Sequence, residues 1–391
     1  MKSCLAILFI TLALPVGGYR AFAKPPVIIS FDQNGVLICT NLTPGSIAAV
    51  AWAPSLQGPW QTDLKGLNAV TVATNGSISV NVPLSGNGPV FYRVLGVPPF
   101  DPNQGMALIP GGSFTMGDSS GDSIPDAMPT NIYISSFYMD TNLVTDSQWQ
   151  SVFTYATSNG YNFDNVGSAK SSASNQPIQT INWFDAVKWC NARSQMAGLT
   201  PVYYTDAGLT QIYTNGDDTN TVYPNWTANG YQLPTEAQWE KAARGGLSGL
   251  RFPWGNTISE SQANYYGDTE NSVNYSDGTS YDLGPDGYNT NFDSGAEPYT
   301  SPVGYFPANG YGIYDMAGNL QQWCWDWYGR SYGLPSTNNP TGPPSGAYDS
   351  LRVTRGGFWG FQAFAARCAY RGQTGPSSAE NDTGFRCVKN P

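Results

Sequence analysis

The 391-residue chain contains no histidine. Without an imidazole side chain, Ser-His-Asp and Cys-His catalysis are excluded, as are histidine-ligated zinc and iron sites built on two histidines and a carboxylate. Basic residues are also few, with 18 Lys and Arg against 28 Asp and Glu. A chain this acidic lacks the cationic surface that neutralises phosphate groups, so no nucleic-acid partner is expected.

Long apolar runs are lacking except at the N-terminus. There a run from Leu5 to Val16 is followed by Ala21-Phe22-Ala23, which is the layout of a secretory signal peptide. We predict that residues 1–23 are this signal and that the mature protein is secreted or periplasmic. No membrane span is expected after cleavage, because a span needs about 18 or more apolar residues; an uncleaved anchor is the alternative. Removing Lys2 and Arg20 leaves a formal charge of 16 − 28 = −12.

Cysteine is sparse, with six residues in the chain. Cys4 leaves with the signal, and the others are Cys39, Cys190, Cys324, Cys368 and Cys387. In an oxidising compartment an odd number means that at least one thiol stays free or pairs between chains.

The pattern along the chain predicts two domains. Residues 24–98 read as a small antiparallel, sandwich-like β domain, in which Val70 and Val72 alternate, Asn75-Gly76 favours a hairpin turn, and residues 78–84 alternate on the return. We interpret this domain as a spacer or docking module. A proline-rich linker over 99–105 separates it from a second domain, residues 106–391.

The second domain shows two helix signals. One runs from Trp183 to about Arg193, is capped by Asn182, and directs Cys190 inward. The other follows Thr235, which forms a capping box with Gln238. Residues 255–300 have no clear period, and a loop region that long is typical of a functional segment or of one tied down by an ion. The fold class expected is α+β.

From residue 106 onward the chain carries a series of motifs: MALIPGGSFTMGD (106–118), NLVTDSQW (142–149), TINWFDAVKWCN (180–191), YQLPTEAQWEKAARGG (231–246), FPWGN (252–256), GYGIYDMAGNLQQWCWDWYG (310–329), RVTRGGFW (352–359) and TGFRCV (383–388). In this order they resemble the formylglycine-generating enzyme family, also called sulfatase-modifying factors, over residues 106–389. The resemblance implies a C-type-lectin-like fold with little regular secondary structure and with bound calcium.

The resemblance also implies an activity. Catalytic members use copper and oxygen to oxidise a sulfatase cysteine to formylglycine, and two thiolates in a Cys-x4-Cys arrangement after Arg-Gly-Gly-Ser hold the copper. Cu(I) is a soft ion that prefers such ligands. This chain has no cysteine between Gly357 and Arg367, and Phe358 stands in place of the serine. Copper is therefore not expected, and we assign no catalytic and no cofactor-binding residue.

For the other cysteines, the resemblance implies a disulfide between Cys190 and Cys387. In the chain-entropy model a bridge that closes so long a loop stabilises by roughly 4–5 kcal/mol. Cys368 matches a structural cysteine whose partner position is Ala243 here, so pairing of Cys368 with Cys324 is left open. Cys39 would then be the odd thiol, buried as a small apolar residue.

The resemblance further implies two calcium sites. The first maps to Asp315, Gly318, Leu320 and Gln322, and the second to Asn264, Tyr265, Asp286 and Tyr288. Asp in place of the family's Asn adds a charge that favours a hard cation, while Gln in place of Glu removes one. The alternative is that these Asp and Asn residues only cap turns.

Three functions remain open on the sequence. The first is a non-catalytic binding or scaffold protein of the family, a pseudoenzyme with a protein or glycan ligand. The second is an enzyme of altered chemistry, and the third is a formylglycine-generating oxidoreductase. The carboxylates Glu236, Glu240 and Asp326 are expected to bond internally to Arg244, Arg355 or Arg386.

Overall fold

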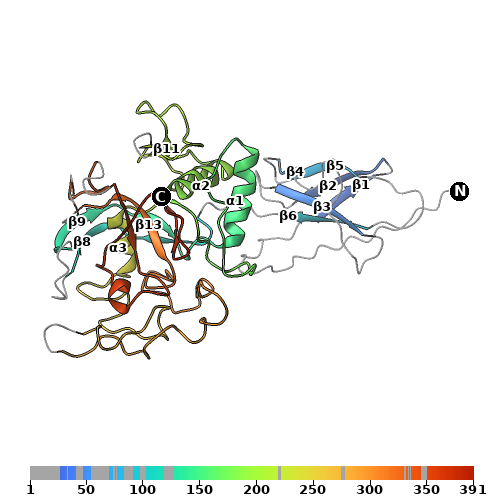
Figure 1. Cartoon of the computed structure of the whole chain (residues 1–391). Helices are drawn as coiled ribbons and strands as arrows, with labels where there is room; N and C mark the ends of the chain where they lie inside the picture. Colours follow the sequence, from blue (N-terminus) through green and yellow to red (C-terminus); the bar gives the residue numbers. More distant parts are fainter. Residues whose placement is uncertain are drawn as a thin grey trace. The chain divides into compact units, whose positions relative to one another are not determined.

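The computed structural model describes residues 27–32, 34–40, 47–53, 70–73, 75, 77–82, 91–96, 103–118, 127–218, 222–273, 278–329, 332, 334, 336–344 and 350–391. The chain divides into two compact units, residues 1–104 and 105–391 (Figure 1). The predicted signal peptide lies outside the described residues, as does most of the predicted linker.

The first unit contains six described strands in two antiparallel sheets. They are β1 (Val27–Phe31), β2 (Val36–Thr40), β3 (Ile47–Ala53), β4 (Val70–Thr71), β5 (Ile78–Asn81) and β6 (Phe91–Gly96). The sheets have the orders β1-β2-β5 and β4-β3-β6. Both contribute to one hydrophobic core, which includes Leu37, Cys39 and Val50.

The hairpin predicted around Asn75 is wrong in its pairing. A backbone bond from Ala73 N to Ser77 O (2.9 Å) closes a turn there, but β4 pairs with β3 and β5 pairs with β2. The turn therefore carries the chain from one sheet to the other. Alternation and turn residues indicate a chain reversal, whereas the choice of partner strand depends on contacts distant in sequence.

The second unit contains short strands in several small sheets. They are β7 (Met106–Ile109), β8 (Gly112–Met116), β9 (Thr130–Ile134), β10 (Phe137–Asp140), β11 (Tyr203–Tyr204), β12 (Tyr223–Pro224), β13 (Gln321–Trp327), β14 (Arg352–Arg355), β15 (Gly372–Thr374), β16 (Thr383–Gly384) and β17 (Val388–Lys389). The largest sheet has the order β15-β14-β13-β16, another has the order β17-β10-β7, and β8-β9 and β11-β12 are ribbons.

Three α-helices accompany these sheets in the described part of this unit: α1 (Asp146–Ser158), α2 (Trp183–Met196) and α3 (Glu236–Ala243). The predicted caps are confirmed, since Asn182 caps α2 and Thr235 forms a capping box with Gln238 at α3. The sequence reading missed α1, which begins with the same kind of box between Thr145 and Gln148.

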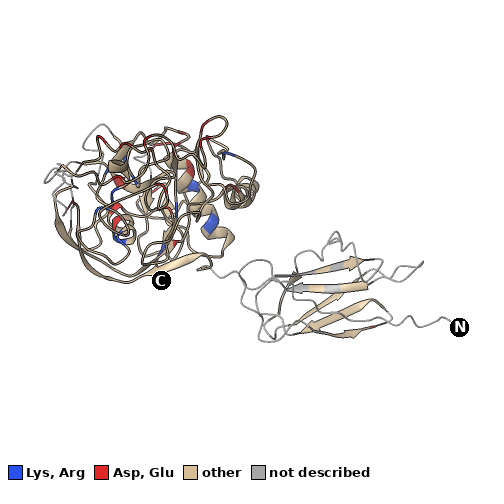
Figure 2. Cartoon of the chain, turned by 90° about the horizontal axis from the view of Figure 1, so that it is seen from below, with Lys and Arg blue, Asp and Glu red and all other residues tan. Residues whose placement is uncertain are grey.

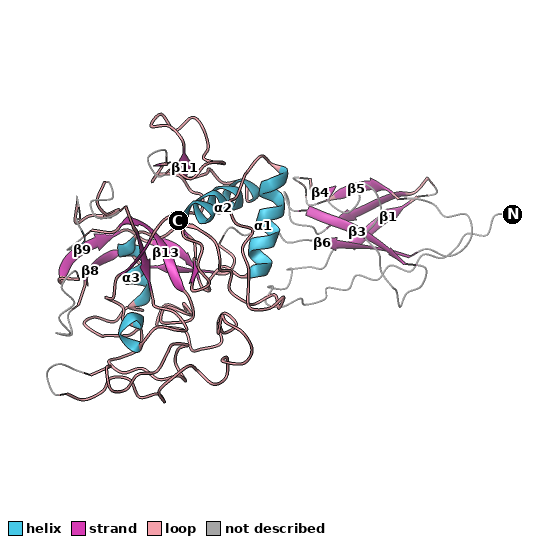
Figure 3. Ribbon diagram, viewed as in Figure 1, coloured by secondary structure: helices cyan, strands magenta, loops and turns pink. Residues whose placement is uncertain are grey.

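Most of the second unit is loop, as Figure 3 shows. In residues 255–300 the described part contains isolated bridges and turns but no helix or strand, as predicted. Acidic and basic positions are interspersed along the ribbon of this unit (Figure 2).

Residues 385–389, near the end of the chain, lie in the core of the second unit. Phe385 packs edge-to-face against Trp149 and Trp189, whose rings are stacked 6.0 Å apart. Val388 in β17 pairs with β10 and exchanges backbone hydrogen bonds with Gln232. In the described residues, no helix is long and apolar enough to cross a membrane.

Candidate functional site

Two glycines shape the turn that follows β14. Gly356 and Gly357 have φ values of 97° and 66°, in the left-handed region. A Cβ on Gly357 would lie 2.9 Å from the backbone carbon of Ala365. The Arg-Gly-Gly motif therefore brings the next residues close against the short 3₁₀ helix η3 (Ala363–Ala366).

Aromatic side chains occupy the segment in which the resemblance places the copper thiolates of catalytic members. We call Phe358, Trp359, Phe361, Phe364 and Tyr370 the aromatic cluster. The Phe358 ring lies 5.9 Å from that of Trp359 and 5.4 Å from that of Phe361. Phe361 lies 5.2 Å from Phe364, and Tyr370 contacts both of these rings. Trp359 is buried and the other four residues are half-buried. Aromatic side chains therefore fill this segment, and part of their surface remains accessible.

The irregular loop packs against this cluster. The Tyr288 ring lies 5.8 Å from Trp359 and 4.9 Å from Tyr299, and Tyr266 N donates to Phe361 O at 3.1 Å. The predicted calcium ligand Tyr288 thus contributes its ring to an aromatic contact.

A buried network of carboxylates and guanidiniums lies next to β14. Glu240 accepts hydrogen bonds from Gly117 N (2.7 Å), from Arg244 Nε (3.0 Å) and from Arg355. Glu236 accepts from Arg371 Nε and Nη2 at 2.6 and 2.8 Å. The expected pairing with Arg244 and Arg355 is confirmed. Arg371 was missed, because no local pattern links it to Glu236.

Asp326 differs from these two glutamates because it accepts a backbone hydrogen bond at the start of α3. Its Oδ2 accepts from Glu236 N at 2.8 Å. Burial, and secondly repulsion from Glu236, raises the pKa of Asp326 from 3.8 to about 8. Hydrogen bonds within the protein therefore explain why all three carboxylates are buried. Each of them holds either the start of α3 or the position of β14.

The prediction that these carboxylates bond to Arg386 is wrong. Arg386 Nε donates to Gln322 Oε1 at 2.8 Å, and its other nitrogens donate to backbone carbonyls of residues 140, 141, 314 and 315. Burial lowers the pKa of Arg386 to about 10. The guanidinium of Arg386 is thus surrounded by carbonyl oxygens of the backbone and of the Gln322 side chain, and we call this the guanidinium pocket.

The first predicted calcium site overlaps this pocket. The Gln322 side chain accepts from Trp239 Nε1 and Arg386 Nε, each at 2.8 Å, and donates to Asp315 O at 2.8 Å. Its oxygen therefore does not fit a cation. Asp315 fits better: its Oδ2 accepts from Gly304 N at 2.9 Å, while its buried Oδ1 has no hydrogen bond within the described residues.

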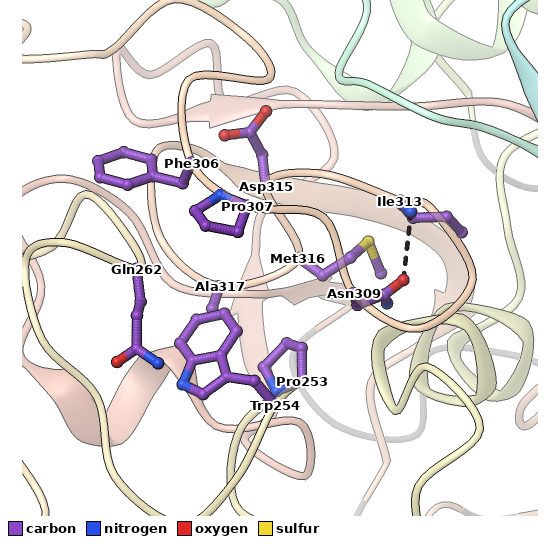
Figure 4. Close-up of a pocket in the computed structure, with 10 residues that line it drawn as sticks. All are labelled: Pro253, Trp254, Gln262, Phe306, Pro307, Asn309, Ile313, Asp315, Met316 and Ala317. Carbon is purple, nitrogen blue, oxygen red and sulfur yellow. Dashed lines mark hydrogen bonds between the residues drawn. The ribbon is translucent and has the colours of Figure 1, made fainter.

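A small cavity of about 10 Å³ lies beside Asp315 (Figure 4). Its walls come from the segments around Trp254 and Gln262 and from residues 306–317. Figure 4 shows the Asp315 carboxylate turned away from the indole of Trp254. The cavity has room for about one water molecule and no substrate.

The residues of the second predicted calcium site are hydrogen-bonded elsewhere. Asn264 Nδ2 donates to Tyr299 O at 2.8 Å, the Tyr265 hydroxyl donates to Asp282, and Asp286 Oδ1 accepts from Thr269 N at 2.8 Å. Asp286 thus serves as a turn cap in this structure. In the described part of the chain, no three His, Cys, Asp or Glu side chains gather into a group that could hold a metal.

Cys190 and Cys387 lie together, as the resemblance implies. Their Sγ atoms are 3.5 Å apart, and both residues are fully buried. Both are thiols in this structure, so the disulfide stays a prediction. Cys324 and Cys368 belong to one hydrophobic cluster, and Cys39 is buried in the first unit.

Comparison with known proteins identifies the fold. A family model described as sulfatase-modifying factor enzyme 1-like domain matches residues 95–391. In solved structures, variable protein 1 of Treponema denticola superposes with a TM-score of 0.54 at 25% identity, covering 79% of this chain and 98% of that protein.

Relatives in sequence carry different names. The chain is 30% identical to the bovine formylglycine-generating enzyme, over 73% of this chain and 75% of that protein. It is 29% identical to the chaperone protein LppX of Paenibacillus barcinonensis, over 73% and 89%. A serine/threonine-protein kinase, pkn1 of Chlamydia caviae, is 32% identical over 73% of this chain, but the match spans only 38% of the kinase. By the family match and these identities, the chain belongs to the sulfatase-modifying factor family.

Proposed function

We propose that the domain over 106–391 is an exported, non-catalytic binding or scaffold member of this family. The aromatic cluster carries the proposal, because Phe358, Phe361 and Phe364 fill the segment that holds copper in catalytic relatives. A ring surface can stack on a protein or glycan ligand but cannot hold Cu(I). The name of the relative LppX, a chaperone protein, is consistent with a role outside catalysis.

The remaining thiols are poor substitutes for the missing pair. A metal binds the thiolate, and burial opposes its formation. Burial raises the pKa of Cys368 to about 12 and raises the pKa of Cys190 and Cys324 well above 9. Copper would therefore find no ready thiolate near the Arg-Gly-Gly turn.

Formylglycine generation is the second candidate, favoured by the 30% identity to the bovine enzyme. To distinguish this activity from the non-catalytic role, the purified chain is incubated with Cu(I), oxygen, a thiol reductant and a Cys-x-Pro-x-Arg peptide. Mass spectrometry then looks for the aldehyde, with the bovine enzyme as the positive control. We expect no aldehyde, and Cu(I) affinity equal to that of a variant without the buried cysteines; turnover above the metal-free control would refute the proposal.

The two-sheet architecture of the first unit supports a sandwich that serves as a spacer or docking module. The many loops and short strands of the second unit are consistent with the C-type-lectin-like fold that the resemblance implies.

Calcium remains part of the proposal in a reduced form. Asp315 would supply a carboxylate oxygen, with backbone carbonyls such as those of Gly318 and Leu320, and Gln322 would not take part. If this holds, a chelator lowers the melting temperature of the chain but not that of an Asp315→Asn variant. Identical melting curves of the untreated and chelated chain would remove calcium from the account.

A further inference from the structure

We propose that a groove over β8 and β9 binds a neutral, hydroxyl-rich ligand, namely an uncharged glycan. The groove has a volume of about 470 Å³ and is lined by Ser113, Asn131, Ile132, Tyr133, Thr337 and Asn338. This volume is within the range of about 300–1,000 Å³ found for small-molecule sites. The inference does not depend on whether the domain is catalytic, because none of these residues belongs to the aromatic cluster or its network.

The register of the ribbon creates the floor of the groove. Ser113 is the cross-strand partner of Tyr133, and Asn131 lies two residues before Tyr133 in the same strand. Residues two apart in a strand project to the same face. The side chains of Ile132 and Ile134 are buried on the opposite face, so Ile132 borders the groove through its backbone. The core thus holds the strand in a register that exposes Asn131 and Tyr133.

A second segment forms the wall and holds it in place. Tyr133 N donates to Thr337 O, and Asn339 N donates to Tyr133 O, each at 2.8 Å. The Asn339 side chain also accepts from Ser135 N at 2.8 Å and donates to Ser135 Oγ at 3.1 Å. The wall is thus fixed to the floor strand before any ligand arrives, which reduces the entropy lost on binding.

The chemistry of the lining selects an uncharged ligand. No lining residue carries a charge, so a phosphate, sulfate or carboxylate group would lose its hydration without gaining a cation. The formal charge of the chain, −10, also disfavours anions. Because Ile132 is buried, Tyr133 is the one exposed aromatic residue of the lining, and a single ring gives too little apolar surface to anchor an apolar peptide side chain.

A neutral sugar fits the same lining well. Tyr133 is 44% exposed, and an accessible tyrosine ring can stack on the C–H side of a pyranose. Around it, the side chains of Ser113, Asn131, Thr337 and Asn338 make no hydrogen bond to the described residues, so they remain available for sugar hydroxyls.

The test uses the purified full chain on an array of short neutral and acidic oligosaccharides, followed by calorimetry with the neutral ones that bind. We expect neutral binders whose affinity changes little with salt. Tyr133→Ala should weaken binding about tenfold or more, and Tyr133→Phe should weaken it less, because it keeps the ring. Tyr305→Ala, which removes another exposed tyrosine ring, is the matched control and should bind normally.

Three results would overturn the proposal: binding of no neutral glycan, binding of acidic glycans only, or neutral binding that Tyr133→Ala leaves unchanged. Melting curves of each variant confirm that the ribbon is folded. Because this readout needs no copper and no peptide, its failure is distinguishable from a failure of the non-catalytic proposal.

Discussion

Replacing Asp326 with asparagine should change how the free energy of unfolding depends on pH. Asp326 is 1% exposed, and burial together with Glu236 raises its pKa from 3.8 to about 8. Between these two pH values the folded protein holds a proton that the unfolded chain releases. The folded state then binds more protons, so this carboxyl group stabilises the protein fully below pH 3.8 and loses that contribution as pH rises towards 8.

The size of the effect follows from linkage. One proton corresponds to a slope of about 1.4 kcal/mol per pH unit. Asp326→Asn keeps an oxygen that can accept from Glu236 N, but it has no proton to lose. Relative to the wild type, the variant should therefore gain stability as pH rises from about 5 to about 7, and the difference should level off above about 8.

Urea unfolding followed by tryptophan fluorescence measures this difference at intervals between about pH 5 and pH 9. Most tryptophans lie in the second unit, so the signal reports that unit. Asp293→Asn, on an exposed loop, removes a carboxylate outside the network and should not reproduce the slope. If wild type and Asp326→Asn stay parallel across the range, Asp326 is ionised in the folded protein and the reasoning is refuted.

Three further predictions concern stability. Glu240→Gln should lower the free energy of unfolding in urea by about 3–5 kcal/mol, because two buried guanidiniums lose their carboxylate partner. The control Glu297→Gln, at an exposed position, should change it little. A loss below about 1 kcal/mol for Glu240→Gln would contradict this reasoning. Gly230→Ala should lower the free energy of unfolding by about 1–3 kcal/mol in the same assay, because the new Cβ would lie 2.2 Å from a backbone carbonyl oxygen. An unchanged unfolding midpoint would show that the loop rearranges without cost. After secretion in oxidising medium, alkylation and peptide mass spectrometry should find Cys190 bonded to Cys387, and free thiols at both would rule the bridge out.

Local signals in the sequence were sufficient to predict parts of the fold. Capping residues determine where α2 and α3 begin, because the cap and the N–H group it binds are three residues apart. The same signal at Thr145 precedes α1, but this helix has few buried residues, so its apolar pattern is weak. Helix α2 is buried almost all round, including Lys188, which a pattern with one apolar face does not predict.

The site was less predictable because its contacts join distant segments. Arg371 reaches Glu236 across 135 residues, and Arg386 reaches Asp140 O across 246. The family pattern placed Gln322 in a calcium site, but only the structure reveals that Arg386 and Trp239 already bind its oxygen. The wall that fixes Tyr133 likewise comes from a segment about 200 residues further along the chain.

The buried position of residues 385–389 affects how the protein is made. Phe385, Arg386 and Cys387 contact parts of the domain that the ribosome synthesised about 200 or more residues earlier. A nascent chain that stops short of them leaves a ring stack, a guanidinium pocket and a strand edge unfilled, so the domain cannot close during synthesis. A nonsense codon only a few positions before residue 385 would give a product that proteases remove.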